Sequence, residues 1–335
     1  MLNSFAESHI GQRKINEDNY LIDDELDLYI VADGVGGMAK GEIASNLACE
    51  VISKSIKSGL GLKESVQIAH ANILESIQQD QGKQGMATTI VAVLFMDDQY
   101  EIVWVGDSRA YIWDDGLKLI TRDDSYVELL LEYGHIGIEE LETHPDRNVI
   151  SQALGVEGKD VCVHSNKGTL QDGQILLLCT DGLYNVADEM NIIESIEKTH
   201  NIKEITHSLV NKAVTKDGKD NITLLSILNS NDSSNSNNVI KPQVFREYDS
   251  KTGKVISFPS KDKSKELSGH VKEKAESENN RPTEPNNLTV NDRNRLDSAA
   301  NQFTSHIQPS NPILPIVFGV ILLSFIAILI TYFQS

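Results

Sequence analysis

The chain has 335 residues, 40% of them hydrophobic, and a formal net charge of −19. This length allows one sizeable core, and the acidic balance argues against nucleic acid as a partner, because nucleic-acid binding needs a positive field. The three cysteines, Cys49, Cys162 and Cys179, form no Cys-x-x-Cys pair, so the sequence indicates neither zinc nor a disulfide framework and is typical of a reducing compartment.

The first predicted element is a buried strand at residues 28–32, which carry no charge. Two helices follow at residues 42–57 and 63–78, where apolar residues recur at helical spacing. The later predicted elements are strands at 88–96, 100–105, 109–113, 174–180 and 221–228 and two amphipathic helices within 188–214. Short connections between strands favour antiparallel pairs, and runs of strands beside pairs of helices predict an α+β layer fold rather than a doubly wound one.

The acidic excess lies in residues 1–228, which hold 18 Lys and Arg against 38 Asp and Glu, whereas residues 229–335 hold 12 against 11. Residues 1–228 are therefore predicted to form the globular domain. Residues 229–312 are polar, with few apolar residues and no lasting periodicity, and we expect them to form a disordered linker.

The stretch "ILPIVFGVILLSFIAILITYF" at residues 313–333 contains no charged residue. As a helix it would be about 31 Å long, which matches the hydrocarbon core of a bilayer and predicts a transmembrane helix. Only Gln334 and Ser335 follow it, and the first residues, "MLNSFAESHIGQRK", lack the apolar run of a signal peptide. The expected location is therefore the membrane, through a single-pass tail anchor that leaves the globular domain in the cytoplasm.

Two Asp-Gly pairs follow uninterrupted apolar runs, in "LYIVADG" and "QILLLCTDG". Taken alone, Asp-Gly indicates a turn. A buried strand that ends on aspartate also brings a carboxylate to the edge of a sheet, however, so Asp33 and Asp181 are candidate ligands. Asp220 lies just before the last predicted strand, and these three side chains could meet at one edge.

Carboxylate oxygens are ligands that Mg²⁺ and Mn²⁺ prefer. Gly34 has no Cβ to block its backbone carbonyl from a metal. Two ions that share one carboxylate can lower the pKa of a bridging water and direct it at phosphorus. Arg13 lies near Glu17 and Asp18 in "GQRKINED", and its planar guanidinium suits the oxygens of a phosphate group.

Eight motifs together resemble the bacterial form of the metal-dependent protein phosphatases, the type 2C serine/threonine family. In order they are "RKINEDNY", "VADGVGGMAKGEIAS", "GMATTIVAVL", "VGDSRAYIW", "ITRDDSYVELLLEYGHI", "HPDRNVISQALG", "LLLCTDGLYNV" and "KDNITLL". They cover about residues 8–228, the whole predicted globular domain. Each motif is weak by itself, but the eight in this order are specific.

The resemblance implies a four-layer α-β-β-α sandwich of two antiparallel sheets flanked by helices. It also implies two Mn²⁺ or Mg²⁺ ions at one edge of that sandwich. Asp33 would bridge both ions and the Gly34 carbonyl would bind one of them, while Asp181 and Asp220 complete the shell of the other.

The same resemblance assigns roles to the neighbouring residues. Glu17 and Asp18 would act on metal-bound water, and Arg13 would bind the substrate phosphate. Asp123 falls at the place of a weaker third ion, inside a flap of about residues 121–155. In contrast, Asp107 and Arg109 of "VGDSRAY" are expected to stabilise the turn between two strands.

The chain departs from the family where relatives place a histidine, because Val35 and Met38 stand at those positions. The general acid therefore stays open between a metal-bound water and another group. The expected function is hydrolysis of phosphoserine and phosphothreonine in proteins. The alternative is a catalytically weak, membrane-tethered module that only binds phosphoproteins. The expected partners are phosphorylated proteins, with a bacterial serine/threonine kinase as the opposing enzyme.

Overall fold

The computed structural model describes residues 1–36, 40–80, 84–158, 160–230 and 239–258. These residues belong to one compact unit, Met1–Lys263. No helix among them is long and apolar enough to cross a membrane. The predicted transmembrane helix at 313–333 lies outside the described residues, as does most of the predicted linker.

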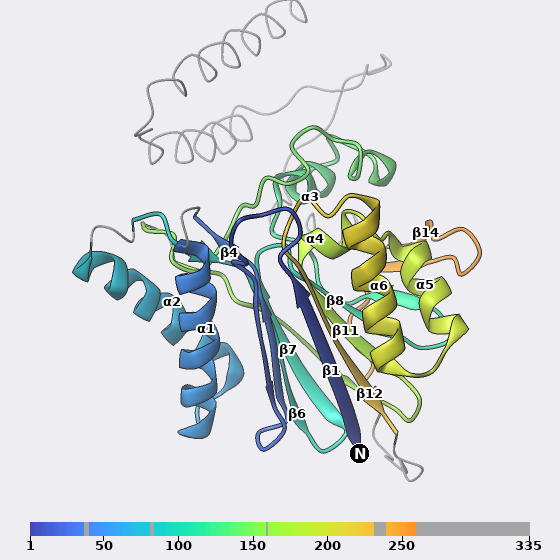
Figure 1. The fold of residues 1–335 in the computed structure, drawn as a ribbon, viewed down its shortest axis with the longest axis horizontal. Coiled ribbons are helices and arrows are strands. Elements are labelled where there is room, and N and C mark those ends of the chain that lie inside the picture. Colours follow the sequence, from blue (N-terminus) through green and yellow to red (C-terminus); the bar gives the residue numbers. More distant parts are fainter. Residues whose placement is uncertain (37–39, 81–83, 159, 231–238, 259–335) are drawn as a thin grey trace, which may run out of the picture. The chain divides into compact units, whose positions relative to one another are not determined.

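Two antiparallel sheets form the centre of the fold (Figure 1). The five-stranded sheet has the order β10-β7-β6-β3-β2, and the seven-stranded sheet has the order β1-β12-β11-β8-β9-β13-β14. The strands of the first are β2 (Asn19–Asp23), β3 (Leu28–Ala32), β6 (Ile90–Met96), β7 (Gln99–Val105) and β10 (His164–Thr169). Those of the second are β1 (Leu2–His9), β8 (Arg109–Trp113), β9 (Leu117–Leu119), β11 (Ile175–Cys179), β12 (Ile222–Asn229), β13 (Arg246–Tyr248) and β14 (Val255–Ser257). A short ribbon pairs β4 (Gly34–Val35) with β5 (Ala87–Thr88).

Helices cover the outer faces of both sheets (Figure 1). The helices are α1 (Lys40–Lys57), α2 (Leu62–Gln79), α3 (Tyr126–Glu132), α4 (Asp181–Tyr184), α5 (Glu189–Lys198) and α6 (Ile202–Lys216), with a 3₁₀ helix, η2, at Ile138–Glu140. One apolar cluster joins α1 and α2 to the five-stranded sheet. A second joins α5 and α6 to the seven-stranded sheet, and a third fills the space between the sheets. The expected α+β architecture of two antiparallel sheets with helices is therefore confirmed.

The alternation of side chains along each central strand explains these layers. In β3, Leu28 and Ile30 pack toward the helices, whereas Tyr29 and Val31 pack between the sheets. Both faces are buried, so the strand is apolar throughout. This is why β3, β6 and β11 are visible as continuous apolar runs in the sequence.

The predicted start of the disordered linker, at residue 229, lies before a segment that is structured. Residues 239–258 are ordered against the domain, and β13 and β14 extend the seven-stranded sheet beyond β9. The prediction of disorder is wrong for this segment. Its composition is polar, but residues such as Arg246 and Tyr248 are buried against the domain.

Candidate active site

Three of the predicted ligands lie where strands of the two sheets end. Asp33 links β3 to β4, and Asp181 begins α4 directly after β11. Asp220 lies two residues before β12, which is paired with β11. A Cβ atom on Gly182 would lie 1.9 Å from the carbonyl oxygen of Asn221, so only glycine allows the chain after Asp181 to pass this close to the Asp220 loop.

The three carboxylates are close enough to oppose one another's ionisation. The pKa of Asp33 is raised well above its usual range, first by burial and then by the charges of Asp18, Asp181 and others. Burial and the charge of Asp220 raise the pKa of Asp181 to about 6. The fold therefore gathers negative charge at one edge of the sandwich, and this arrangement favours a cation.

Asp18 is buried beneath this edge. Its Oδ2 accepts hydrogen bonds from Thr180 Oγ1 at 2.9 Å and from Thr223 Oγ1 at 2.7 Å. Its Oδ1 is buried and meets no hydrogen-bond donor among the described residues. Burial raises the pKa of Asp18 to about 7. Since buried polar atoms are almost always satisfied, this oxygen indicates a partner outside the described residues, and a bound cation or water would fit.

Glu17 is held at the start of α1. Its amide donates to Asn221 Oδ1 at 2.8 Å, and its Oε1 accepts from the Gly41 amide at 3.0 Å. Its carbonyl accepts from the Gly34 amide at 3.1 Å. A Cβ atom on Gly34 would lie 2.3 Å from the Gly41 carbonyl group, so Gly34 permits α1 and the Asp33 loop to lie in contact.

Arg13 lies at the exposed rim of the edge. Its Nη2 donates to Asp220 Oδ2 at 2.7 Å. Its pKa is raised first by this hydrogen bond, and the charges of Asp181 and Asp33 act in the same direction. The structure thus brings Arg13 close to the charges of all three predicted metal ligands. Two of these, Asp181 and Asp220, are at least 168 positions away from Arg13 in the sequence.

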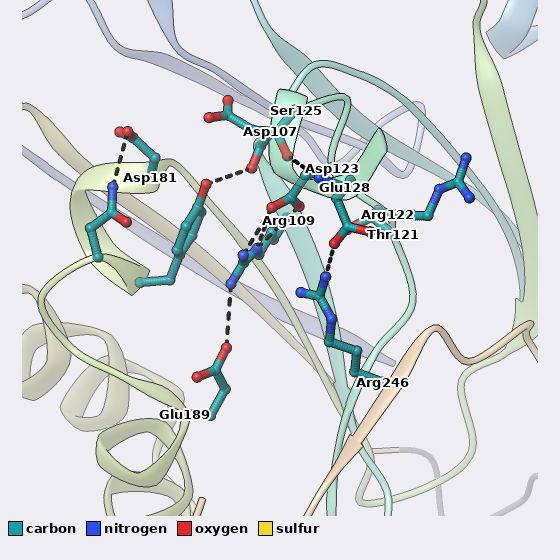
Figure 2. Close-up of polar contacts among 12 residues, drawn as sticks. Asp107, Arg109, Thr121, Arg122, Asp123, Ser125, Glu128, Asp181, Glu189 and Arg246 are labelled. Carbon is teal, nitrogen blue, oxygen red and sulfur yellow. Dashed lines mark hydrogen bonds and ion pairs between the residues drawn. The ribbon is translucent and has the colours of Figure 1, made fainter. Parts of the chain in front are cut away.

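Asp123 is engaged by an arginine (Figure 2). Arg109 Nε donates to both oxygens of Asp123 at 3.1 Å, and Arg109 Nη2 donates to Oδ2 at 2.8 Å. Arg109 Nη1 reaches Glu189 at 3.3 Å, and its guanidinium lies 3.7 Å from the centre of the Tyr184 ring. Both oxygens of Asp123, the residue expected at a third metal, thus already receive hydrogen bonds from Arg109 of β8. The flap segment itself holds α3 and η2.

Asp107 belongs to the acidic edge, although its sequence context indicates only a turn. It is buried, and its pKa is raised well above the usual range by burial and then by the charges of Asp181 and Asp123. Its carbonyl accepts from the Tyr184 hydroxyl at 3.1 Å (Figure 2). The signal that could have identified it is its place just after a buried strand, β7, like that of Asp33 after β3 and of Asp181 after β11.

The chemistry of these residues fits a divalent cation. All the candidate ligand atoms are oxygens, the type of ligand that Mg²⁺ and Mn²⁺ prefer. Within the described ranges, no three His, Cys, Asp or Glu side chains are gathered in the arrangement of a metal site. The fit rests instead on the unpaired Asp18 Oδ1 and on the excess of carboxylates over the guanidinium groups of Arg13 and Arg109.

Comparisons with known proteins agree with this chemistry. A family model described as protein phosphatase 2C matches residues 6–216. The serine/threonine phosphatase stp of Listeria innocua is 34% identical over 227 residues, which are 64% of this chain and 90% of that protein. The serine/threonine protein phosphatase PstP of Mycobacterium tuberculosis is 33% identical over 205 residues, which are 59% of this chain and 39% of that protein.

Solved structures are similar over the same part of the chain. A crystal structure of Mycobacterium tuberculosis PstP has a TM-score of 0.63 and 31% identity, and the match covers 69% of this chain and 99% of that one. A structure of the PstP catalytic domain in complex with two manganese ions has a TM-score of 0.61 and 29% identity, with the same coverage.

Proposed function

Because the chain belongs to the protein phosphatase 2C family and is a serine/threonine protein phosphatase, we propose that it hydrolyses phosphoserine and phosphothreonine at the acidic edge of its sandwich. The observation that carries this proposal is the convergence of Asp33, Asp181 and Asp220 beside Arg13. Carboxylates and a guanidinium at one place suit a metal-dependent reaction on a phosphate ester.

In this proposal, Asp33, Gly34, Asp181 and Asp220 would hold two Mn²⁺ or Mg²⁺ ions. The structure of PstP with two manganese ions supports this number. When bound, such ions supply an activated water and positive charge for the phosphoryl oxygens. A third ion at Asp123 would compete with Arg109, which already donates to both oxygens of that side chain.

The chain's own groups bind the substrate and handle protons. Arg13 would donate hydrogen bonds to two oxygens of the phosphate. It can leave Asp220 to do so, because an exposed ion pair is weak. Asp18 Oδ1 is the unpaired oxygen and is therefore suited to accept a proton or a hydrogen bond from the attacking water. Glu17 is fixed beside it by α1 and by Asn221.

Release of inorganic phosphate from phosphoserine and phosphothreonine peptides tests this function directly. The full-length chain in detergent is expected to release phosphate with Mn²⁺ or Mg²⁺ and to stop when EDTA is added. Matched peptides without phosphate are the control. Tight binding of the phosphopeptides without turnover at any Mn²⁺ concentration would favour the binding module instead.

The apolar stretch near the C-terminus predicts where the enzyme is located. Residues 313–333 are apolar along their whole length and uncharged, and we expect them to anchor the enzyme in a membrane. The domain would then act on phosphoproteins near the cytoplasmic surface, opposing a serine/threonine kinase. The tether would raise the effective concentration of the enzyme for membrane-bound substrates.

A further inference from the structure

Residues 239–258, here called the strap, lie beyond the part of the chain that the family model matches, which ends at residue 216. The strap holds β13 and β14 and lies beside α5 (Figure 1). The reaction proposed for Asp33, Asp181 and Asp220 makes no use of the strap.

The strap is hydrogen-bonded to both sheets. Asn166 of β10 donates from Nδ2 to the Gln243 carbonyl at 2.8 Å and accepts from the Gln243 amide at 3.0 Å. Two residues later, the Phe245 amide donates to the Leu119 carbonyl of β9 at 2.8 Å. The Phe245 ring also packs edge-on against Trp104, with 6.0 Å between the ring centres. These contacts fix the strap at the edge of the sandwich.

Arg246 connects the strap to the flap. It forms an ion pair with Glu128 of α3, and the side chains of both residues are only 8% exposed (Figure 2). The Glu128 amide is held in turn by Ser125 Oγ, the N-cap of α3, at 3.3 Å. Breaking a buried pair leaves a charge without a partner, which is strongly destabilising. Arg246 of the strap thus contacts the first turn of α3 through a buried ion pair.

The strap, the flap and residues 184–189 line an open cavity of about 310 Å³. Glu128, Arg246 and Tyr248 line one part of it, and Asp123 and Asn185 line another. Asn185 Nδ2 donates to Asp181 Oδ2 at 3.1 Å, so the cavity begins beside a predicted metal ligand. A peptide whose phosphorylated residue lies at Asp181 could place its neighbouring residues there.

We propose that Arg246 is a positioning residue for substrate binding: it holds α3 so that flap and strap form a cavity that receives the peptide beside the phosphorylated residue. This inference rests on the proposed phosphatase function. It makes the strap part of the catalytic unit and assigns peptide specificity to a segment that the family model does not include.

The test compares three variants of the full-length chain in detergent. Arg246→Met leaves Glu128 buried without its partner, and Arg246→Met with Glu128→Met removes both charges. Lys57→Met is the control, because it breaks the ion pair of Lys57 with Asp23, 3.0 Å apart, between α1 and β2. Hydrogen exchange of the amides in α3 and steady-state hydrolysis of two substrates, a phosphothreonine peptide and p-nitrophenyl phosphate, are measured with Mn²⁺.

Arg246→Met is expected to speed exchange in α3 at least about tenfold and to lower kcat/KM for the peptide by about as much, whereas p-nitrophenyl phosphate, too small to reach the strap, changes less than about twofold. The double variant should recover slow exchange, and the control should match the parent. Unchanged exchange in α3, or equal losses on both substrates, would overturn the proposal. If the parent chain hydrolyses neither substrate, the phosphatase function fails, and exchange alone still decides whether Arg246 holds α3.

Discussion

Arg13 is predicted to act on substrate rather than on stability. Its side chain is 55% exposed, and an exposed ion pair with Asp220 contributes little to folding. Arg13→Ala should therefore raise KM for a phosphopeptide about tenfold or more, the loss expected for a charged hydrogen-bonding pair, while the unfolding temperature stays unchanged.

Lys14→Ala provides the matched control, since Lys14 is an exposed cation next to Arg13. Steady-state kinetics at saturating Mn²⁺ separate KM from kcat for both variants. An unchanged KM together with weaker Mn²⁺ binding in Arg13→Ala would mean that Arg13 supports the acids and does not bind phosphate.

Asp107 is predicted to contribute to the acidic edge and not only to the turn between two strands. Its buried carboxylate faces the charges of Asp181 and Asp123, so Asp107→Asn should relieve repulsion and leave the metal-free protein as stable as the parent or more stable. Mn²⁺-dependent turnover should nevertheless fall. Thermal unfolding without metal and phosphate release with Mn²⁺ measure the two effects.

Asp115→Asn is the control for that substitution, because Asp115 is the exposed aspartate of an Asp-Gly turn after β8. It should change neither stability nor turnover. Full activity of Asp107→Asn would return Asp107 to the structural role that its sequence context indicates.

At the scale of elements, His70 joins α2 to the end of the flap. Its Nδ1 accepts from the Gly155 amide at 3.1 Å, and burial lowers its pKa. The unfolded chain, with a histidine pKa of about 6.5, then binds more protons than the folded chain when the pH falls below that value. The stability that His70 contributes is complete above about pH 6.5 and is lost as the pH falls through the lower pKa of the folded state.

When the pH falls from 7.5 to 5.5, the His70→Asn variant should lose less free energy of unfolding than the parent. The reason is that Asn keeps an acceptor for the Gly155 amide and does not titrate. This window spans about two pH units around the unfolded pKa of histidine. Urea unfolding at the two pH values gives the comparison. His200→Asn, at an exposed position, should behave like the parent. Equal losses in all three proteins would show that His70 does not carry the pH dependence.

The central elements could be predicted from the sequence because burial on both faces forces apolar residues into β3, β6 and β11. The strap could not, since its two strands have three residues each and gain their stability from distant partners such as Asn166. A local signal does exist in "VFREYDSKTGKVISF", where Asp249 accepts from the Thr252 amide in the turn between the strands.

At the site, the sequence allowed the strand-end acids Asp33 and Asp181 to be selected, since each follows an apolar run. It left Asp107 out because a Gly-Asp-Ser segment between two strands also suits a turn. Which acids share one edge depends on the pairing of β11 with both β8 and β12. Such long-range pairing is absent from the local pattern.

The predicted anchor should determine where the enzyme is located in the cell but not its turnover in solution. Deleting residues 308–335 is expected to move the protein into the soluble fraction, since it removes the apolar stretch at 313–333. Turnover of a phosphopeptide in solution should stay the same, because the described domain ends well before residue 308. Fractionation after a high-salt wash and a solution assay measure both.

Two outcomes of that experiment would contradict the tether. A truncated protein that still sediments with membranes must be held by another element. A truncated protein without activity in solution would make the deleted residues part of the enzyme.

We predict that the acidic edge of the sandwich binds the metal ions with which the enzyme hydrolyses phosphoserine and phosphothreonine. The most direct test is the rate of phosphate release from a phosphothreonine peptide as a function of Mn²⁺ concentration, for the parent chain and for Asp33→Asn. We predict saturable activation of the parent and a rate at least about 100-fold lower in the folded variant at every concentration, since a bound metal supplies several kcal/mol of transition-state stabilisation. Activation of Asp33→Asn to the rate of the parent, or phosphate release by the parent in EDTA, would contradict the claim.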